Sequence, residues 1–369
     1  MKATIKLHMD VCRTLCDIEN NGIKVDVPKL LNIEKDFRNE HTEIERELNS
    51  MIIELCGDTP INLASAEDRS KLFYSKIVIN KKEWKEIFDL GTVVTKDGKR
   101  KKKFVRTSSP SMFKSKYQFK VGAFLKTHKI SCNLCRGTGT VDFMKKDGTY
   151  GMPRKCKKCF GKGVVYMNTK EKAGLGLNPL NEKDLSVHGF KTDISTIKEK
   201  MLQVHGRERE FLKKYMRYNA LSTYLNTFID SIKSNTGKDG FIHPQFMQCV
   251  TATGRLSSRN PNFQNMPRSA TFPVREAIVS RFDGGKILEG DYSQLEFRVA
   301  GFLAGDKQVL QDVNDEVDVH SYTASIIGVS RQEAKAHTFK PLYGGKTGTT
   351  SEVRYYEAFL EKYSGIAEW

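Results

Sequence analysis

The chain has 369 residues, 38% hydrophobic and 28% charged, which is typical of a folded protein with two or three domains and excludes a disordered chain. It contains no run of about 18 apolar residues and no apolar signal core near Met1, so we expect an intracellular, cytoplasmic protein without a membrane span. Residues 91–185 carry 23 Lys and Arg against 6 Asp and Glu, which accounts for the whole net charge of +17. This localised charge favours contact with phosphate groups over a merely solvated surface.

The first 90 residues are predicted to begin with two helices. Apolar residues lie on one helical face over Ile5–Cys16, Asn20–Gly22 breaks that pattern, and Pro28 opens a second helix that continues towards Leu55. Ser65 is a plausible cap for a further helix. These helices precede the basic segment.

The basic segment contains two matching cysteine pairs. Cys132 and Cys135 are separated by 20 residues from Cys156 and Cys159, and each pair continues with the same glycine pattern, CxxCxGxG. Two residues between thiols let one turn present both sulfurs to an ion, and four thiolates close a tetrahedral, structural Zn²⁺ site. The alternative is a set of free thiols, which would not explain the paired glycines. The repeat resembles the zinc module of DnaJ-type chaperones over about residues 131–164.

Residues 91–185 as a whole are predicted to form an inserted module, because they also contain Ser/Thr-rich turns and a glycine-rich end. The other four cysteines show no pairing pattern, which is typical of a reducing compartment. The basic side chains around the cysteine pairs leave two roles open: contact with a nucleic-acid backbone, or docking of a protein partner. Residues 192–234 return to a helical pattern, and after residue 240 short strands alternate with helices, which indicates an α+β fold.

Two segments after residue 250 place polar side chains where they could take part in chemistry. Thr251–Arg268 is rich in turns and in Arg, Asn and Gln donors. In Lys286–Val299, an apolar strand is predicted to deliver Asp291 at its end, and a helix follows. A carboxylate held rigidly at the end of a strand suits a metal site, whereas the alternative role of Asp291 is to cap the next helix.

The last part of the chain contains a helical pattern of two cations followed by two aromatic residues. Arg331, Lys335, Phe339 and Tyr343 are spaced four residues apart, so a helix would carry them along one slowly drifting face. Such a face suits a triphosphate at one end and a base at the other. Pro341 lies inside this pattern and predicts a kink or an early end of the helix.

Together these strings resemble the signature motifs of family A DNA polymerases. TGRLSS and PNFQN occur within residues 251–265, DYSQLEFR at residues 291–298 resembles motif A, Asp318–Ala324 resembles the DIHTxTA segment, and the R-x3-K-x3-F-x3-YG string resembles motif B. With weaker matches before them, the resemblance covers about residues 1–75 and 190–369.

The resemblance implies roles for individual residues in nucleotide addition. Asp291 would bind two Mg²⁺ ions, with the Tyr292 carbonyl helping to hold one, and Glu296 would exclude a 2′-hydroxyl group. Lys335 would grip phosphate and also protonate the leaving pyrophosphate. The implied nucleotide-binding residues are Tyr292, Gln294, Glu296, His320, Arg331, Lys335, Phe339 and Tyr343. The implied DNA contacts, through the minor groove of a primer–template duplex, are Arg255, Gln264 and Asn265.

The implied fold is a partial right-hand polymerase of the α+β class, with a helical thumb, an antiparallel palm sheet, the start of helical fingers and a small zinc-binding insertion. The expected divisions are the thumb base at 1–90, the basic insertion at 91–185, the returning thumb helices at 186–245, part of the palm at 246–305 and part of the fingers at 306–369. The implied partners are primer–template DNA and deoxynucleoside triphosphates, and the implied cofactors are two catalytic Mg²⁺ and one structural Zn²⁺.

One element of this family's catalytic site is missing from the sequence. The family holds its metal ions with a second aspartate in a later segment, motif C, and no His-Asp-Glu string occurs in these 369 residues. Three explanations are open: a split polymerase completed by a second polypeptide that carries motif C, a fragment of a longer enzyme, or a non-catalytic zinc-module DNA-binding or adaptor protein on a polymerase scaffold. A split enzyme with an unusual thumb insertion would suit a viral source.

Overall fold

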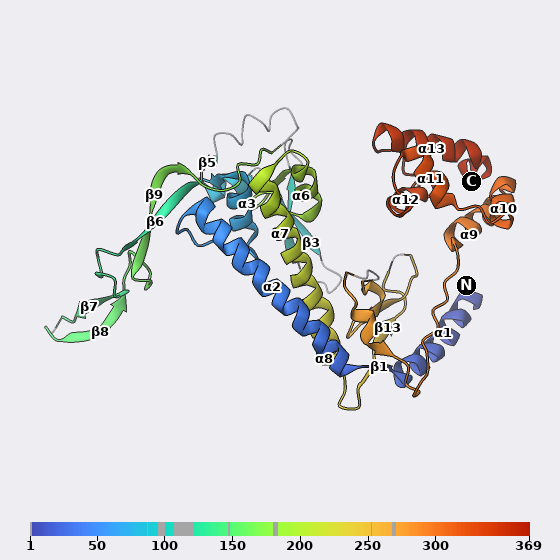
Figure 1. Cartoon of the computed structure of the whole chain (residues 1–369), viewed down its shortest axis with the longest axis horizontal. Helices are drawn as coiled ribbons and strands as arrows, with labels where there is room; N and C mark the ends of the chain where they lie inside the picture. Colours follow the sequence, from blue (N-terminus) through green and yellow to red (C-terminus); the bar gives the residue numbers. More distant parts are fainter. Residues whose placement is uncertain are drawn as a thin grey trace. The chain divides into compact units, whose positions relative to one another are not determined.

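The computed structural model of the chain describes residues 2–86, 88–94, 100–106, 121–146, 148–179, 184–251, 253–267 and 271–369. They form two compact units, Met1–Gly285 and Lys286–Trp369, whose elements are labelled in Figure 1. Helices and small antiparallel sheets are mixed, which confirms the α+β class. Within the described residues, no helix has both the length and the apolar character that crossing a membrane requires.

The first unit starts with two helices on either side of a short strand, as the sequence predicted. Helix α1 (Lys2–Asn21) ends before Gly22, whose φ of +64° costs glycine little. Strand β1 (Ile23–Val25) follows, and the Asp26 carboxylate accepts a hydrogen bond from the first turn of α2 (Val27–Cys56). The glycine and the capping aspartate therefore set the bounds of these elements.

A group of later helices packs on α2. Its members are α3 (Ala66–Tyr74), α6 (Ile194–Met201), α7 (Gly206–Thr223), a π-helical turn (Tyr224–Ile229) and α8 (Asp230–Asn235). The Ser65 hydroxyl caps α3, as predicted. The helical pattern of 192–234 is divided rather than continuous, because Gly206 takes a φ of +58°, which the interior of a right-handed helix does not contain.

These helices enclose the largest core of the first unit. Leu48 of α2, Phe73 of α3 and Phe211 of α7 are fully buried in one cluster. The rings of Phe73 and Tyr215 meet edge to face with centroids 5.1 Å apart. Burial of this apolar surface, worth roughly 25 cal/mol per Å², fixes the position of the helices that carry the inserted segment.

Short antiparallel strands lie beside a second core. Strand β1 is the centre of a three-stranded sheet, between β12 (Phe241–Ile242) and β15 (Ile278–Val279). Strand β13 (Gln245–Met247) pairs with β14 (Ser257–Arg259), and 3-10 turns follow at Phe263–Asn265 and Val274–Ala277. The first of these turns carries two of the predicted DNA contacts, Gln264 and Asn265.

The inserted segment is a series of hairpins. The described elements of this segment and of the residues flanking it, in chain order, are β2 (Lys76–Val78), α4 (Lys81–Glu86), β3 (Phe88–Val94), β4 (Arg100–Arg106), β5 (Val121–Ala123), β6 (Leu125–Ser131), β7 (Thr140–Met144), β8 (Tyr150–Lys155), β9 (Val164–Lys172), β10 (Leu185–Ser186) and β11 (Gly189–Phe190). Strand β6 pairs with β9 and β7 pairs with β8. We name residues 125–172 the cysteine arm; Figure 1 shows it running away from α2 and α3.

The second unit is helical. Its elements are α9 (Leu295–Ala304), α10 (Lys307–Asn314), α11 (Val319–Ile327), α12 (Arg331–Thr338), a 3-10 turn (Pro341–Tyr343), α13 (Thr350–Lys362) and α14 (Ser364–Glu368). Phe297 of α9 is buried at the centre of its core, with ring centroids 5.8 Å from Phe339 and 5.1 Å from Tyr363. The residues predicted to bind a nucleotide are therefore arranged around one small aromatic core.

Replacing Asp312 by alanine should destabilise this second unit by about 2 kcal/mol, because the buried carboxylate accepts hydrogen bonds from Tyr363 Oη (2.8 Å) and Lys362 Nζ (2.7 Å). Burial opposes ionisation of Asp312, but these partners outweigh burial and lower its pKa. A lowered folded-state pKa means that the stabilisation is present above the unfolded-state pKa, about 4, and is lost as pH falls through the folded-state value. Urea unfolding of the wild type and the variant at neutral and acidic pH checks both points; an equal difference at both would contradict the second.

Candidate functional site

Asp291 lies in an extended, exposed stretch rather than at the end of a strand. Among the described residues, 286–290 pair with no neighbouring strand, so the predicted strand is wrong for this structure. A strand needs a partner for its backbone N–H and C=O groups, and the 97% exposure of Leu288 shows that nothing covers the apolar side either. The alternative role of Asp291 is also excluded, because Gln294 occupies the N-cap position of α9.

The predicted motif A and motif B residues meet at Glu296. Tyr343 Oη donates a hydrogen bond to Glu296 Oε2 at 2.6 Å, joining positions 47 residues apart. The residue after Glu296, Phe297, stacks on Phe339. The aromatic end of the second motif thus lies beside the carboxylate predicted to face the sugar.

Helix α12 ends earlier than the spacing of its predicted residues. Ser330 and Glu333 form a capping box at its start, and Phe339 is already the C-cap residue. Pro341 then opens a separate 3-10 turn that carries Tyr343. The early end of the helix that was predicted from Pro341 is confirmed. Proline has no backbone N–H and so cannot donate the hydrogen bond that would continue the helix. Arg331 and Lys335 are exposed on α12, whereas Tyr343 is held by another element.

Arg331 is held by an acidic residue that the sequence analysis did not single out. Its Nε lies 2.5 Å from Asp318 Oδ2 and its Nη2 lies 3.3 Å from Oδ1. The guanidinium holds the pKa of Asp318 well below its usual value, and the carboxylate raises the pKa of Arg331. Both side chains, with Ser293 and Arg298, line a cavity of about 420 Å³. The pair is partly exposed, so it can exchange its carboxylate for another anion at small cost.

His320 lies in the first turn of α11. Its Nδ1 is 2.9 Å from the Thr338 hydroxyl, and its ring meets Phe339 edge to face at 5.4 Å. Burial lowers the pKa of His320, so that the ring is neutral at pH 7. A neutral imidazole offers one N–H donor without adding a positive charge.

The three predicted DNA contacts are exposed on the loops before and after β14. Gln264 and Asn265 lie on the 3-10 turn, whose backbone is capped by the Asn262 side chain. Phe263 and Met266, on either side of them, pack into the second core. This alternation anchors the turn and leaves the amide side chains facing solvent. Arg255 is exposed on the loop before β14.

The four cysteines form one cluster, as the spacing predicted. Their sulfurs all lie within 4.8 Å of one another, and all four side chains are buried. The Sγ atoms of Cys132 and Cys156 are 3.7 Å apart, and those of Cys135 and Cys159 are 3.6 Å apart. Four mutually close thiols without an open position fit a structural Zn²⁺ site.

The two halves of the cluster are built alike. The backbone N–H of Gly139 points at Cys135 Sγ and that of Gly163 at Cys159 Sγ, each at 3.3 Å. A Cβ at either glycine would lie within 2.4 Å of a carbonyl oxygen in the other half, so glycine is required there. Burial opposes ionisation of Cys159, but the Gly163 N–H and the neighbouring thiols outweigh it and lower its pKa, whereas burial and its thiol neighbours raise the pKa of Cys135.

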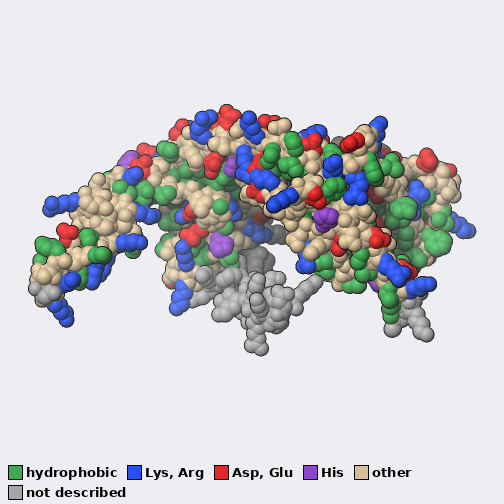
Figure 2. Space-filling view, turned by 90° about the horizontal axis from the view of Figure 1, so that it is seen from below, with side chains coloured by type: hydrophobic (Ala, Val, Ile, Leu, Met, Phe, Trp, Pro, Cys, Tyr) green, Lys and Arg blue, Asp and Glu red, His purple; other side chains and the backbone are tan. Residues whose placement is uncertain are grey.

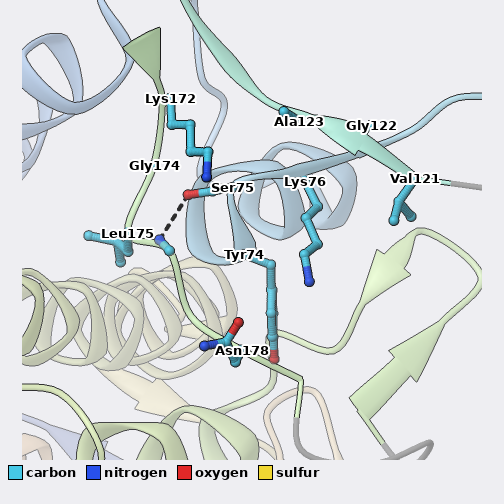
Figure 3. A pocket seen from close by; sticks show the side chains of 11 residues that line it. Tyr74, Ser75, Lys76, Val121, Gly122, Ala123, Lys172, Gly174, Leu175 and Asn178 are labelled. Atoms are coloured by element: carbon cyan, nitrogen blue, oxygen red, sulfur yellow. Dashed lines mark hydrogen bonds between the residues drawn. The ribbon is translucent and has the colours of Figure 1, made fainter. Parts of the chain in front are cut away.

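A second cavity, of about 490 Å³, lies at the root of the cysteine arm. Figure 3 shows Lys76 and Lys172 flanking Ser75, whose hydroxyl accepts a hydrogen bond from the backbone N–H of Gly176 (2.8 Å). The described lining contains these two lysines and no carboxylate. Sequence reasoning missed this site because Lys76 and Lys172 are far apart in the chain. Asp318 could have been found, since an aspartate at the start of such a segment is a candidate helix cap.

Comparisons with known proteins cover most of the chain. A profile described as DNA polymerase family A matches residues 173–369. The thermostable DNA polymerase I of Thermus thermophilus is 32% identical over 206 residues, 51% of this chain and 24% of that relative. DNA polymerase I of Pseudomonas aeruginosa is 32% identical over 193 residues, 47% of this chain and 21% of that relative. The matched part is thus less than a quarter of either relative.

Among solved structures, the POL domain of Pol1 from M. smegmatis, described as a complex with DNA primer-template and dNTP, matches 98% of this chain and 48% of that chain. The TM-score is 0.56 and the sequence identity 19%. This likeness shows a shared fold and extends over both units of the chain.

Proposed function

Because the chain belongs to DNA polymerase family A, we propose that it adds deoxynucleotides to a primer 3′ end on a DNA template during replication. The observation that best supports this proposal is the hydrogen bond between Tyr343 and Glu296 (2.6 Å), since it brings the two candidate nucleotide-binding motifs to one place. The cationic side chains of Arg331 and Lys335 project from the same unit.

In this proposal each candidate residue has a separate role in nucleotide addition. Arg331 exchanges Asp318 for the triphosphate, and Lys335 lies one helical turn away, where it neutralises phosphate charge and gives a proton to the leaving pyrophosphate. Glu296, with Tyr343 against it, leaves no room for a 2′-hydroxyl. Gln294, His320 and Phe339 complete the surroundings of the nucleotide, and Arg255, Gln264 and Asn265 contact the duplex.

Magnesium is the metal that this family implies. Asp291 and the Tyr292 carbonyl offer oxygen donors, the type that Mg²⁺ prefers, and would hold it. Bound there, it would stabilise negative charge on the reacting phosphate. The four cysteines are the only group of three or more His, Cys, Asp or Glu close enough to hold a metal ion within the described part of the chain. These residues therefore supply part of a magnesium site, and we propose that a second carboxylate comes from polypeptide beyond these 369 residues.

Two sources of that carboxylate remain proposals: a separate chain with a His-Asp-Glu segment, or a further stretch of the same chain. The uncovered Leu288 beside Asp291 supports either, because a partner strand would cover it. A virus-encoded, intracellular protein stays a prediction. The competing proposal is a DNA-binding protein without catalysis, which the basic insertion and the cysteine cluster favour.

Primer extension tests the function. Protein isolated from its natural source, in whatever assembly it forms, should extend a primer with Mg²⁺ and deoxynucleotides, whereas the 369-residue chain made alone should extend it negligibly. Robust extension by the isolated chain would overturn the need for an external carboxylate but not the polymerase function. No extension by the natural assembly, with DNA binding retained, would overturn the polymerase function and favour the non-catalytic alternative.

A further inference from the structure

One surface of the cysteine arm is apolar and exposed, although it plays no part in folding the arm. Met144 and Tyr150 are directly paired across β7 and β8, so their side chains share one face. Met152 lies two residues further along β8, next to an irregularity in the pairing between Gly151 and Arg154. These side chains are 60%, 72% and 91% exposed. The opposite face holds Val141, which packs on the cysteines, and Phe143, which lies under Arg154.

Positive charge surrounds this face. Residues 125–172 contain 12 Lys and Arg against 3 Asp and Glu. Across the described residues of the arm, the one ion pair is Lys126 with Glu171. Lys145, Lys146 and Lys155 of the β7–β8 hairpin are exposed and pair with no acidic residue among those described. Figure 2 shows Lys and Arg side chains interleaved with apolar ones along the arm, at the left of the view.

This combination distinguishes between two kinds of partner. Protein–protein interfaces are depleted in lysine, because burying an ammonium group without a partner is costly. Polynucleotides instead supply one phosphate per nucleotide for the lysines and flat bases for exposed rings. In a duplex the bases already stack on one another and their faces are closed to Tyr150, so an exposed ring favours unpaired bases.

We infer that the cysteine arm binds single-stranded DNA. Bases stack on the exposed side chains of Met144, Tyr150 and Met152, and the phosphate backbone runs towards the cavity at the root of the arm. In that cavity Lys76 is half-buried, and its ammonium group lies over the ring of Phe190, 5.7 Å from the centroid. Burial lowers the pKa of Lys76, as expected for a cation that lacks an anion. With Lys172 opposite it and no carboxylate in the described lining, the cavity is suited to phosphate.

The length of the arm suits a run of several nucleotides. Strand β9 has 9 residues from Val164, next to the cysteine cluster, to Lys172 at the root, which corresponds to about 30 Å of extended chain. The β7–β8 hairpin lies beyond Val164 (Figure 1). The arm therefore offers stacking at its tip and charge at its root. This site is separate from the nucleotide-binding residues and goes beyond the proposed polymerase function.

Equilibrium binding of a fluorescent oligothymidine to the whole chain tests the stacking face. The double variant Tyr150→Ala/Met152→Ala should weaken binding about five-fold or more, since the surface on which a base stacks is removed, and should leave binding to a duplex of the same length unchanged. Leu202→Ala, which removes a 78% exposed side chain outside the arm, is the matched control and should change neither. Zinc content and circular dichroism report whether the variants fold.

The salt dependence of the same binding tests the root. For single strands, the slope of log K against log salt falls by about 0.7 for each phosphate group that the protein no longer neutralises, so Lys76→Gln/Lys172→Gln should reduce it by about 1.4. Lys198→Gln/Lys238→Gln, two exposed lysines outside the arm, should leave the slope unchanged.

If the arm variants lose duplex binding and single-strand binding equally, the inference is wrong. It is also wrong if no folded arm variant loses binding, and that result would favour a protein partner for the arm. An oligouridine probe distinguishes DNA from RNA: tighter binding of the RNA would also overturn it. The binding assay contains no deoxynucleoside triphosphate and needs no catalysis. Its outcome is therefore independent of the primer-extension result.

Discussion

Replacing Asp291 by asparagine should reduce primer extension by the natural assembly by about 10³-fold or more. Asparagine keeps the size of the side chain but removes the negative charge that would hold Mg²⁺, and metal ions supply several kcal/mol of transition-state stabilisation in this type of reaction. The exposed position of Asp291, away from any helix cap, means that the substitution should not disturb folding. Single-turnover extension at saturating deoxynucleotide measures the effect.

Binding of primer–template DNA is the readout that separates a catalytic role from a structural one. It should be the same for Asp291→Asn and the wild type in the absence of Mg²⁺, because the proposed duplex contacts lie in the other unit. The control is Asp283→Asn, an exposed aspartate shortly before it in the chain. If both variants lose extension equally, or if Asp291→Asn keeps it, the assignment of Asp291 is wrong.

Removing the metal from the cysteine cluster should unfold the cysteine arm and leave the helical core folded. The described cluster around the thiols includes only two further apolar side chains, Val141 and Val165, which is too little to hold four strands in water. A structural Zn²⁺ contributes apparent binding free energies of about 10–16 kcal/mol at pH 7, which are coupled to folding. Hydrogen exchange should therefore show loss of protection in β6–β9 after chelation, with α2 and α7 unchanged.

The matched variants are Cys156→Ser and Cys249→Ser. Cys156 is buried in the cluster, so serine should abolish the expected content of one zinc per chain and unfold the arm. Cys249 is exposed and outside the cluster, so its replacement should change neither zinc content nor exchange. Protection of β6–β9 that survives in metal-free protein would show that the cluster does not need an ion.

Local backbone chemistry explains the part of the fold that could be predicted from the sequence. Gly22 permits the turn after α1, Asp26 and Ser65 cap helices with their own side chains, and Pro341 ends α12. Each of these effects acts within a few residues, so a single segment contains all the information needed. The cysteine cluster is predictable for the same reason, since its four ligands and their glycines lie within one short stretch.

Contacts between distant segments explain what could not be predicted. Residues 286–290 have the composition of a strand, yet pairing depends on a neighbour that no local pattern supplies. The Tyr343–Glu296 hydrogen bond, the Arg331–Asp318 pair and the two lysines at the root of the arm each join positions from different elements. The chemistry of each residue could be read from its own segment, but the meeting of distant residues could not.

The cysteine arm leaves and re-enters the helical body at a single place, where the backbone N–H of Ala173 donates to the carbonyl of Phe124 (2.9 Å). Phe124 and Ala173 both belong to the main core. None of the described residues between them in the chain is part of that core. Loop-closure entropy rises only slowly with length, so a long excursion between two fixed ends adds little cost to folding. This excursion can therefore be lengthened, exchanged or lost almost independently of the scaffold beneath it, and a new binding surface can be gained without rebuilding that scaffold.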